Sequence, residues 1–390
     1  MRIVLNTHAN DPGTRVCITG LHRRLRERGI EAELNDWTHY DRYDVAVFMA
    51  YDHDMAAARR ANPRIRIAAA DPKQSDRKHL DAAREADFLL VSSVEQRDVF
   101  YRHNRNAVIY YMFPPMRPAE RFHTTREPVV VGYHGNRVHI ECMCETATLA
   151  LNALGRTRPL EFWAIYNIER LGRAHIGVPD SSVVKVRHIQ WSADVEPDTE
   201  VSRSFYEHLP HVDIGIVPNA IPIRDRLTVL EATACHEPEF MYEPFDHILR
   251  FKASCNPGRL YPFAMLGIPV VADFAPSASQ FIRDGESGFV VSSAHGWYEA
   301  METLAESAEL RNRMAAALRT EVARAYDAGL ETFLEFCRKP LRSRPPTIPS
   351  QTSAETELAR LPRYARPRQE GILRRVWARA RRSLRAIPWR

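Results

Sequence analysis

The chain has 390 residues, of which 45% are hydrophobic, and it carries a formal net charge of +5. This length allows two domains with buried cores, and no apolar run approaches the roughly 18 to 20 residues of a membrane-spanning helix. The N-terminal MRIVLNTHAN enters a strand pattern rather than a secretory signal, so we expect a cytoplasmic protein.

Short apolar runs alternate with helical segments over residues 1–115. RIVLN (2–6) predicts a first strand, followed by a loop that contains Gly13 and a helix that ends at Gly29. Further strands are expected at 32–34, 44–50, 64–70, 87–93 and 107–113. Continuous apolar strands separated by helices form parallel sheets covered on both faces, so this part predicts a doubly wound, Rossmann-like α/β domain.

Residues 116–128 interrupt the pattern and are expected to form an interdomain linker. The same alternation then resumes and predicts a second Rossmann-like domain at 129–325. Its strands are expected at 129–136, 160–166, 183–189, 213–218 and 269–274. The segment 219–251 fits no element of this pattern and is long for a connection, so we expect an insertion beside the site.

The C-terminal part is helical and then basic. Helices are expected at 296–307, 308–326 and 329–341, with residues 326–341 as a closing helix, followed by a flexible linker at 342–369. Residues 341–390 hold 13 arginines and 3 acidic residues, a net charge of +10, which leaves −5 for the rest of the chain. This asymmetry suggests that the tail has an anionic partner of its own.

The tail segment 370–390 has the pattern of an amphipathic basic helix. Apolar residues including Trp377 fall on one face of a helical wheel and arginines on the other, which is typical of a helix lying on an anionic membrane surface. The apolar face argues against nucleic acid as the partner. The alternative is a helix that docks on the protein body or on another protein.

Ligands of open α/β sheets bind where the carboxyl ends of the strands, their loops and the helix starts converge. The candidates there are the Gly13 loop, the loop with Gly135 and Asn136, and the helix that begins near Asn256. Lys252 and Arg259 flank that helix start, so a diphosphate is the expected ligand.

The segment KASCNPGRLYPFAMLGIPVVADFAPSASQFIRDGESGFVV, with the Trp-containing helix and the "LR" helix after it, resembles the C-terminal domain of GT-B fold glycosyltransferases. It looks most like the large retaining class that includes bacterial polysaccharide and lipid-sugar transferases. The resemblance covers Lys252 to about Val322; the N-terminal half agrees only in its alternating pattern and its first glycine loop. It implies two Rossmann-like domains facing a central cleft.

The resemblance also implies roles for individual residues. The donor sugar and diphosphate would lie along the loop with Ser277, Ala278 and Ser279, and Lys252 and Arg259 would balance the phosphate charge. The nucleotide sugar would be a substrate, with no cofactor. The cysteines are scattered and we see no D-x-D site of the metal-dependent kind, so we expect no metal.

One departure from the family concerns two glutamates that many members carry on this segment. The equivalent positions here are Ser254 and Pro262, and neither supplies a carboxylate. A proline at 262 is tolerable only in the first helical turn. Either another acid of the insertion contacts the ribose, or the donor differs, or donor binding is lost. The candidate acids are Glu231, Glu237, Glu243 and Asp246.

The polar residues that follow strands are the catalytic candidates. His8, Asp11, Asp52, His53 and Asp71 come after strands of the first domain, and His134 precedes Gly135 in the second. Of these, we assign His134, Asp71 and His53 as the catalytic candidates. An inverting transfer would need such a histidine or carboxylate as its base, whereas a retaining transfer needs no protein base because the leaving phosphate oxygen can accept the proton.

The sequence therefore predicts a glycosyltransferase, of retaining stereochemistry by the resemblance. It would move a sugar from a nucleotide-sugar donor to a glycan or lipid-linked acceptor at the cytoplasmic face of the membrane. The alternative is a non-catalytic GT-B module that acts as a partner subunit or scaffold, with Ser254 and Pro262 marking a lost donor site.

Overall fold

The computed structural model describes residues 1–9, 15–73, 77–113, 116, 118–135, 139–140, 143–166, 177–190, 207–219 and 257–343. All of them lie in one compact unit, Met1–Pro345. Several predictions therefore fall outside the described residues: those for Gly13, Asn136, Lys252, Asn256, most of the 219–251 insertion and the segments 344–369 and 370–390. The described helices include none long and apolar enough to cross a membrane.

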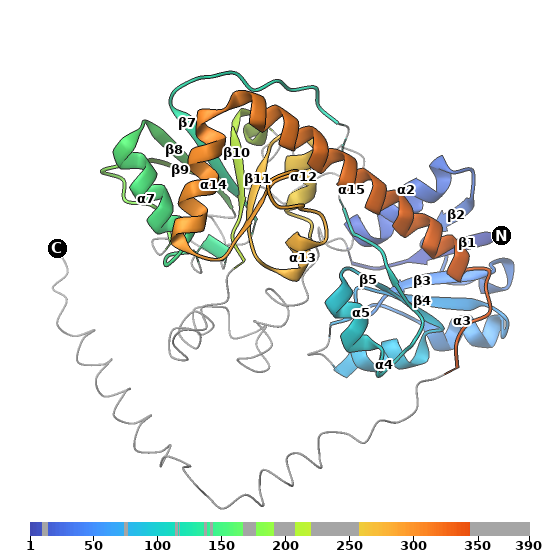
Figure 1. Ribbon diagram of the computed structural model, residues 1–390. Helices are drawn as coiled ribbons and strands as arrows, with labels where there is room; N and C mark the ends of the chain where they lie inside the picture. Colours follow the sequence, from blue (N-terminus) through green and yellow to red (C-terminus); the bar gives the residue numbers. More distant parts are fainter. Residues whose placement is uncertain are drawn as a thin grey trace, which may run out of the picture. The chain divides into compact units, whose positions relative to one another are not determined.

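The first domain is a six-stranded parallel sheet in the order β2-β1-β3-β4-β5-β6 (Figure 1). Its strands are β1 Arg2–Asn6, β2 Glu31–Leu34, β3 Val45–Met49, β4 Arg66–Ala70, β5 Phe88–Val91 and β6 Ala107–Ile109. Its helices are η1 Arg15–Thr19, α2 Gly20–Glu27, η2 Tyr40–Arg42, α3 Met55–Ala61, α4 Arg77–Glu85 and α5 Val94–Phe100. Both faces are covered, because Ile3 and Leu5 belong to one hydrophobic core and Val4 to another.

The second domain repeats this plan with the order β12-β11-β10-β7-β8-β9. Its strands are β7 Val129–His134, β8 Leu160–Tyr166, β9 Lys185–Gln190, β10 Ile214–Val217, β11 Val270–Asp273 and β12 Phe289–Val291. Its helices are α7 Ala147–Thr157, η3 Leu209–His211, α12 Leu260–Met265, α13 Pro276–Ser279, α14 Ala294–Glu306 and α15 Ala308–Phe336. Every strand that the sequence predicts is present, so the fold class of two doubly wound α/β domains is confirmed.

The strand expected at 107–113 is shorter than predicted, because β6 ends at Ile109. The residues that follow stay buried but divide between two cores. Tyr110 and Met112 pack in the core of the first sheet, while Tyr111 and Phe113 pack in a core of the second. This apolar run therefore continues as a connection between domains rather than as a strand.

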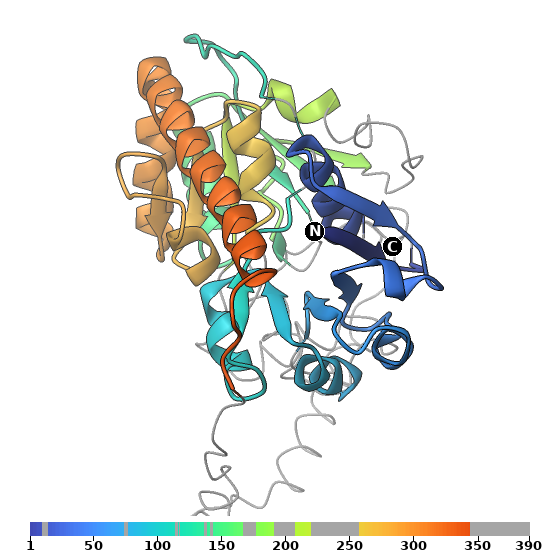
Figure 2. The same cartoon turned by 90° about the vertical axis from the view of Figure 1, so that its right-hand side faces the viewer.

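The prediction of separate helices at 308–326 and 329–341 is wrong: α15 is one continuous helix of 29 residues (Figure 2, orange). Gly329 does not break it. A Cβ added there would lie 3.2 Å from the carbonyl oxygen of Ile109, so the missing side chain lets α15 approach β6 closely. Arg24 of α2 fixes the same stretch, since its Nη1 donates to the Tyr326 carbonyl at 3.0 Å and its guanidinium lies 3.5 Å from the centre of the Tyr326 ring.

Candidate functional site

The carboxyl ends of β7, β10 and β11 meet at one edge of the second sheet, since β10 pairs in parallel with both neighbours. Strand order reverses between β7 and β10, and such a switch point is where open α/β sheets bind ligands. His134 and Gly135 end β7, Pro218 and Asn219 follow β10, and Asp273 ends β11.

Arg259, which precedes α12, connects these strand ends. Its Nη1 donates to the Pro218 carbonyl at 2.7 Å and its Nη2 to Asn219 Oδ1 at 3.2 Å. The buried carboxylate of Asp273 continues the network, because it accepts from the Asn219 backbone N–H at 2.6 Å and from Trp297 Nε1 at 2.9 Å. Arg259 keeps further N–H groups on its fork, so it is held in place and can still bind an anion.

His134 is buried beneath this network. Its Nε2 donates to the Arg259 carbonyl at 2.9 Å, and its ring meets Phe263 edge-on at 4.7 Å between centroids. Burial lowers the pKa of His134 to about 3, with a further lowering by the Arg259 charge and a partial offset by the hydrogen bond, so the ring is neutral. These contacts give His134 a positioning role between β7 and α12; its direct contact with a sugar stays a prediction.

Gly135 has a backbone conformation that favours glycine, with φ of 131°. A Cβ built there would lie 3.0 Å from Arg259 Cδ and 3.2 Å from the Tyr133 hydroxyl. The sequence led us to expect that a glycine at position 135 lets a phosphate approach the backbone closely. Among the described residues, the group that lies against Gly135 is instead the aliphatic part of the Arg259 side chain.

Pro262 is the third residue of α12, so it lies in the first turn as the sequence required. The amide nitrogens of that turn have no partner within a helix, so the missing donor costs nothing there. Its side chain is buried, and position 262 contributes no acceptor to the site.

The donor-loop residues of α13 differ in their surroundings. Ala278 belongs to the hydrophobic core and Ser277 is 7% exposed. Ser279 is exposed, and its hydroxyl donates to the Ala275 carbonyl at 3.0 Å. Of the three predicted residues, Ser279 is thus the one whose side chain lies at the surface.

A second polar group lies at the carboxyl edge of the first sheet, after β1 and β3. Asp52 Oδ1 accepts from His8 Nδ1 at 2.9 Å, and Asp52 Oδ2 accepts from the Thr7 hydroxyl at 3.1 Å. The His8 ring stacks on Trp37 at 3.9 Å and is largely exposed. Burial alone would raise the pKa of Asp52, but the hydrogen bonds from His8 and Thr7 lower it overall. The carboxylate therefore holds the ring with Nε2 as its acceptor nitrogen.

The predicted residues His53 and Asp71 also belong to this edge. His53 is half-buried, and Asp71, with φ of 49°, accepts from Lys73 Nζ at 2.7 Å. Among the described residues, no hydrogen bond joins either of them to His134. The sequence named His8 and Asp52 without pairing them and missed Asn219 and Asp273, although their places at strand ends were a usable signal.

No protein-family model matches the chain, and no curated protein sequence matches it. Among solved structures the chain is similar to TarM, with 11% identity and a TM-score of 0.47. The match covers 76% of this chain and 55% of TarM, so the chain spans about half of the length of that protein. It is similar to Anabaena HepE, solved with UDP and glucose, with 12% identity and a TM-score of 0.48 over 86% of this chain and 98% of HepE. It is also similar to WaaG, a glycosyltransferase involved in lipopolysaccharide biosynthesis, with 11% identity and a TM-score of 0.48 over 87% of this chain and all of WaaG (100%).

The Gly135 geometry gives a first test of the site. Gly135→Ala should lose about 3 kcal/mol of unfolding free energy, from backbone strain and from displacement of Arg259, and should weaken nucleotide binding. Gly285→Ala is the matched control, because Gly285 also has a positive φ of 77° but no atom of the described residues lies within 4 Å of the added Cβ. It should lose about 1 kcal/mol and leave binding unchanged. Equal effects of both variants on binding would contradict the assigned contact.

Proposed function

We propose that the chain is a glycosyltransferase that uses a nucleotide-sugar donor. The observation that carries the proposal is the anchored Arg259 fork at the switch point of the second sheet. The resemblance of the segment from Lys252 to Val322 to GT-B enzymes supports the same conclusion. The donor diphosphate binds at the Arg259 fork, beside the Gly135 loop, with Lys252, outside the described residues, as a second cation.

The transfer proceeds with retention and without a metal or other cofactor. The negative charge that develops on the leaving diphosphate is balanced by guanidinium and ammonium groups. The leaving phosphate oxygen accepts the proton of the acceptor hydroxyl, so no protein base is required. Proton NMR of the first-formed product anomer tests retention, and undiminished turnover in EDTA tests metal independence; loss of turnover in EDTA would refute the latter.

Calorimetry with a panel of nucleoside diphosphates and nucleotide sugars tests the donor site. Arg259→Met keeps the aliphatic stem and should weaken binding by about tenfold or more, as expected for a lost charge-assisted hydrogen bond. Arg324→Met is the control, because that arginine is exposed on α15. Unchanged affinity in Arg259→Met would place the donor elsewhere. A folded wild-type protein that binds no nucleotide would favour the scaffold alternative, which the lack of carboxylates at Ser254 and Pro262 supports.

A non-reacting hydroxyl of the acceptor binds at His8 Nε2 on the first domain, because Asp52 and Trp37 fix the ring and leave its outer edge exposed. Asp52→Asn removes the carboxylate that sets the tautomer and should raise the KM for the acceptor about tenfold, with the KM for the donor unchanged. Asp36→Asn is a matched control, since Asp36 holds His39 in a similar pair on the same domain. An unchanged acceptor KM in Asp52→Asn would refute this role.

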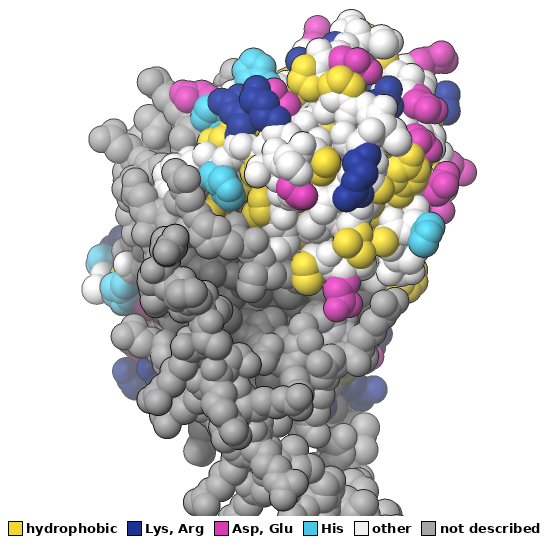
Figure 3. Space-filling view, turned by 90° about the vertical axis from the view of Figure 1, so that its left-hand side faces the viewer, with side chains coloured by type: hydrophobic (Ala, Val, Ile, Leu, Met, Phe, Trp, Pro, Cys, Tyr) yellow, Lys and Arg dark blue, Asp and Glu magenta, His cyan; other side chains and the backbone are white. Residues whose placement is uncertain are grey.

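The basic segment 370–390 attaches the enzyme to the cytoplasmic face of a membrane, where a lipid-linked acceptor also lies. On the face that Figure 3 shows, acidic and basic side chains of the described residues are interspersed. The tail is the candidate for lipid binding because its sequence pattern places arginines opposite an apolar face. Deletion of 370–390 should abolish co-sedimentation with vesicles rich in phosphatidylserine and leave nucleotide binding intact. Undiminished co-sedimentation of the truncated protein would contradict the attachment.

A further inference from the structure

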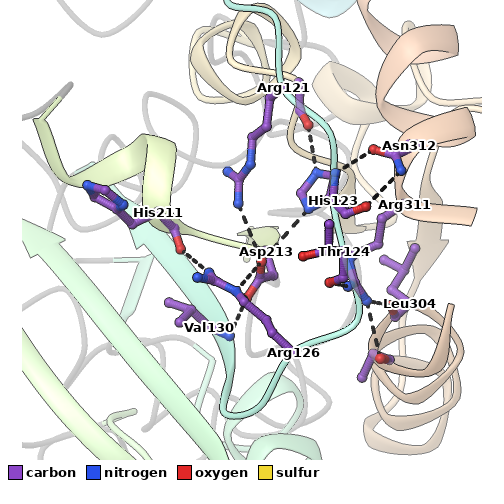
Figure 4. Close-up of polar contacts among 12 residues, drawn as sticks. Arg121, His123, Thr124, Arg126, Val130, His211, Asp213, Leu304, Arg311 and Asn312 are labelled. Atoms are coloured by element: carbon purple, nitrogen blue, oxygen red, sulfur yellow. Dashed lines mark hydrogen bonds and ion pairs between the residues drawn. The ribbon is translucent and has the colours of Figure 1, made fainter. Parts of the chain in front are cut away.

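The amino edge of the second sheet carries a buried charged cluster that the proposed activity does not use. Asp213 precedes β10 and is 2% exposed. Its carboxylate accepts from Arg126 Nη2 at 2.8 Å, from the Val130 backbone N–H at 2.9 Å and from Arg121 Nη2 at 3.4 Å. Figure 4 shows the guanidinium groups of Arg121 and Arg126 pointing toward this carboxylate.

The cluster holds more positive than negative charge. Arg311 of α15, only 1% exposed, donates to the carbonyl groups of Ala305 and Thr124 at 3.2 and 3.0 Å, and its charge is close enough to interact with Asp213. Two guanidinium groups thus contact one carboxylate, and the charge of Arg311 adds to theirs. Burial lowers the pKa of Arg121 to about 10 even though Asp213 opposes the shift, and the charges of Arg126 and Arg311 add to the lowering. The arginines therefore repel one another.

The same cluster contains buried polar atoms without a hydrogen-bonding partner among the described residues. They include the donor atoms Arg121 Nη1 and Arg311 Nε. His123 donates from Nε2 to the Gly267 carbonyl at 2.8 Å, and its Nδ1 faces Asp213 Oδ1 at 3.8 Å. Guanidinium nitrogens can only donate, and a buried donor without an acceptor is costly. An ordered water molecule would satisfy these donors, yet it would leave the excess charge in place. An anion satisfies both requirements.

We propose that Arg121 and Arg126 bind a small oxyanion beside Asp213, either free phosphate or the phosphate group of a sugar phosphate. Planar guanidinium forks match the oxygen geometry of such an ion. The side chains of Arg121 and Arg126 are 15% and 43% exposed, so the cluster is open to solvent on that side. Because it lies at the amino ends of β7 and β10, it is separate from the donor site at their carboxyl ends.

The bound ion would stabilise the 118–128 segment, which connects the two domains. Arg121, His123 and Arg126 all belong to the 118–128 segment, whose His123 backbone N–H donates to Asn312 Oδ1 of α15 at 2.7 Å. Neutralising the cluster lets this segment lie against both α15 and the start of β10 without repulsion. Phosphate should therefore stabilise the whole fold rather than change nucleotide affinity.

Thermal unfolding of the full chain tests the proposal. Inorganic phosphate, titrated against chloride at constant ionic strength, should raise Tm saturably by a few degrees. The shift should be lost in Arg121→Met and kept in Arg324→Met. The Tm shift should also persist in Arg259→Met, which separates this site from a donor site that could bind phosphate as well.

Glucose 1-phosphate in place of phosphate distinguishes free phosphate from a sugar phosphate as the ligand. An equal Tm shift shows that a sugar phosphate fits, and a shift with free phosphate alone shows that only the ion does.

Arg121→Lys serves if the methionine variant does not fold, because it keeps the charge and loses the fork. It should raise the phosphate concentration at half-maximal shift about tenfold. A wild-type Tm that does not respond to phosphate, a response that rises without saturation, or a response lost in Arg259→Met but kept in both Arg121 variants would each overturn the proposal.

Discussion

Helix α15 belongs to hydrophobic cores of both domains, and the rest of the architecture depends on this sharing. Its first half places Leu318 and Val322 in a core of the second sheet, and its second half places Leu330 and Phe333 in the core of the first. Tyr326, between them, packs against both. Because packed side chains resist sliding, a displacement of one half of this continuous helix would also displace the other half. The domain connection at 118–128 is held to the same helix.

The second sheet has arginine contacts at both of its edges. Its amino edge holds the buried Asp213 cluster, whose contacts fix backbone and connection. Its carboxyl edge holds Arg259, whose fork is only partly used by Pro218 and Asn219. In parallel sheets the carboxyl edge is where loops and helix starts leave room for ligands. Arginine side chains thus make contacts at both ends of these strands, with Asp213 at one end and with Pro218 and Asn219 at the other.

The sequence was sufficient to predict the strands and the fold class, because buried parallel strands are continuous apolar runs and that signal is local. It predicted Gly135 and Arg259 as site residues but not the contact between them, since that contact depends on the packing of α12 against β7. It suggested a break between two helices just before Gly329, whereas α15 is continuous there and the glycine is required by the closeness of Ile109 on a distant strand. The position of His134 beside a loop glycine suggested that it contacts the ligand. Its deep burial depends on tertiary contacts that the sequence does not reveal.

The connection after β6 shows how tightly chain length is constrained between the domains. Tyr110 and Met112 enter one core, and Tyr111 and Phe113 enter the other, so successive side chains serve opposite partners. Inserting one residue before Tyr110 would exchange these assignments and present each ring to the wrong core, whereas inserting two would restore them. Homologous chains should therefore differ in length at this connection by even numbers of residues.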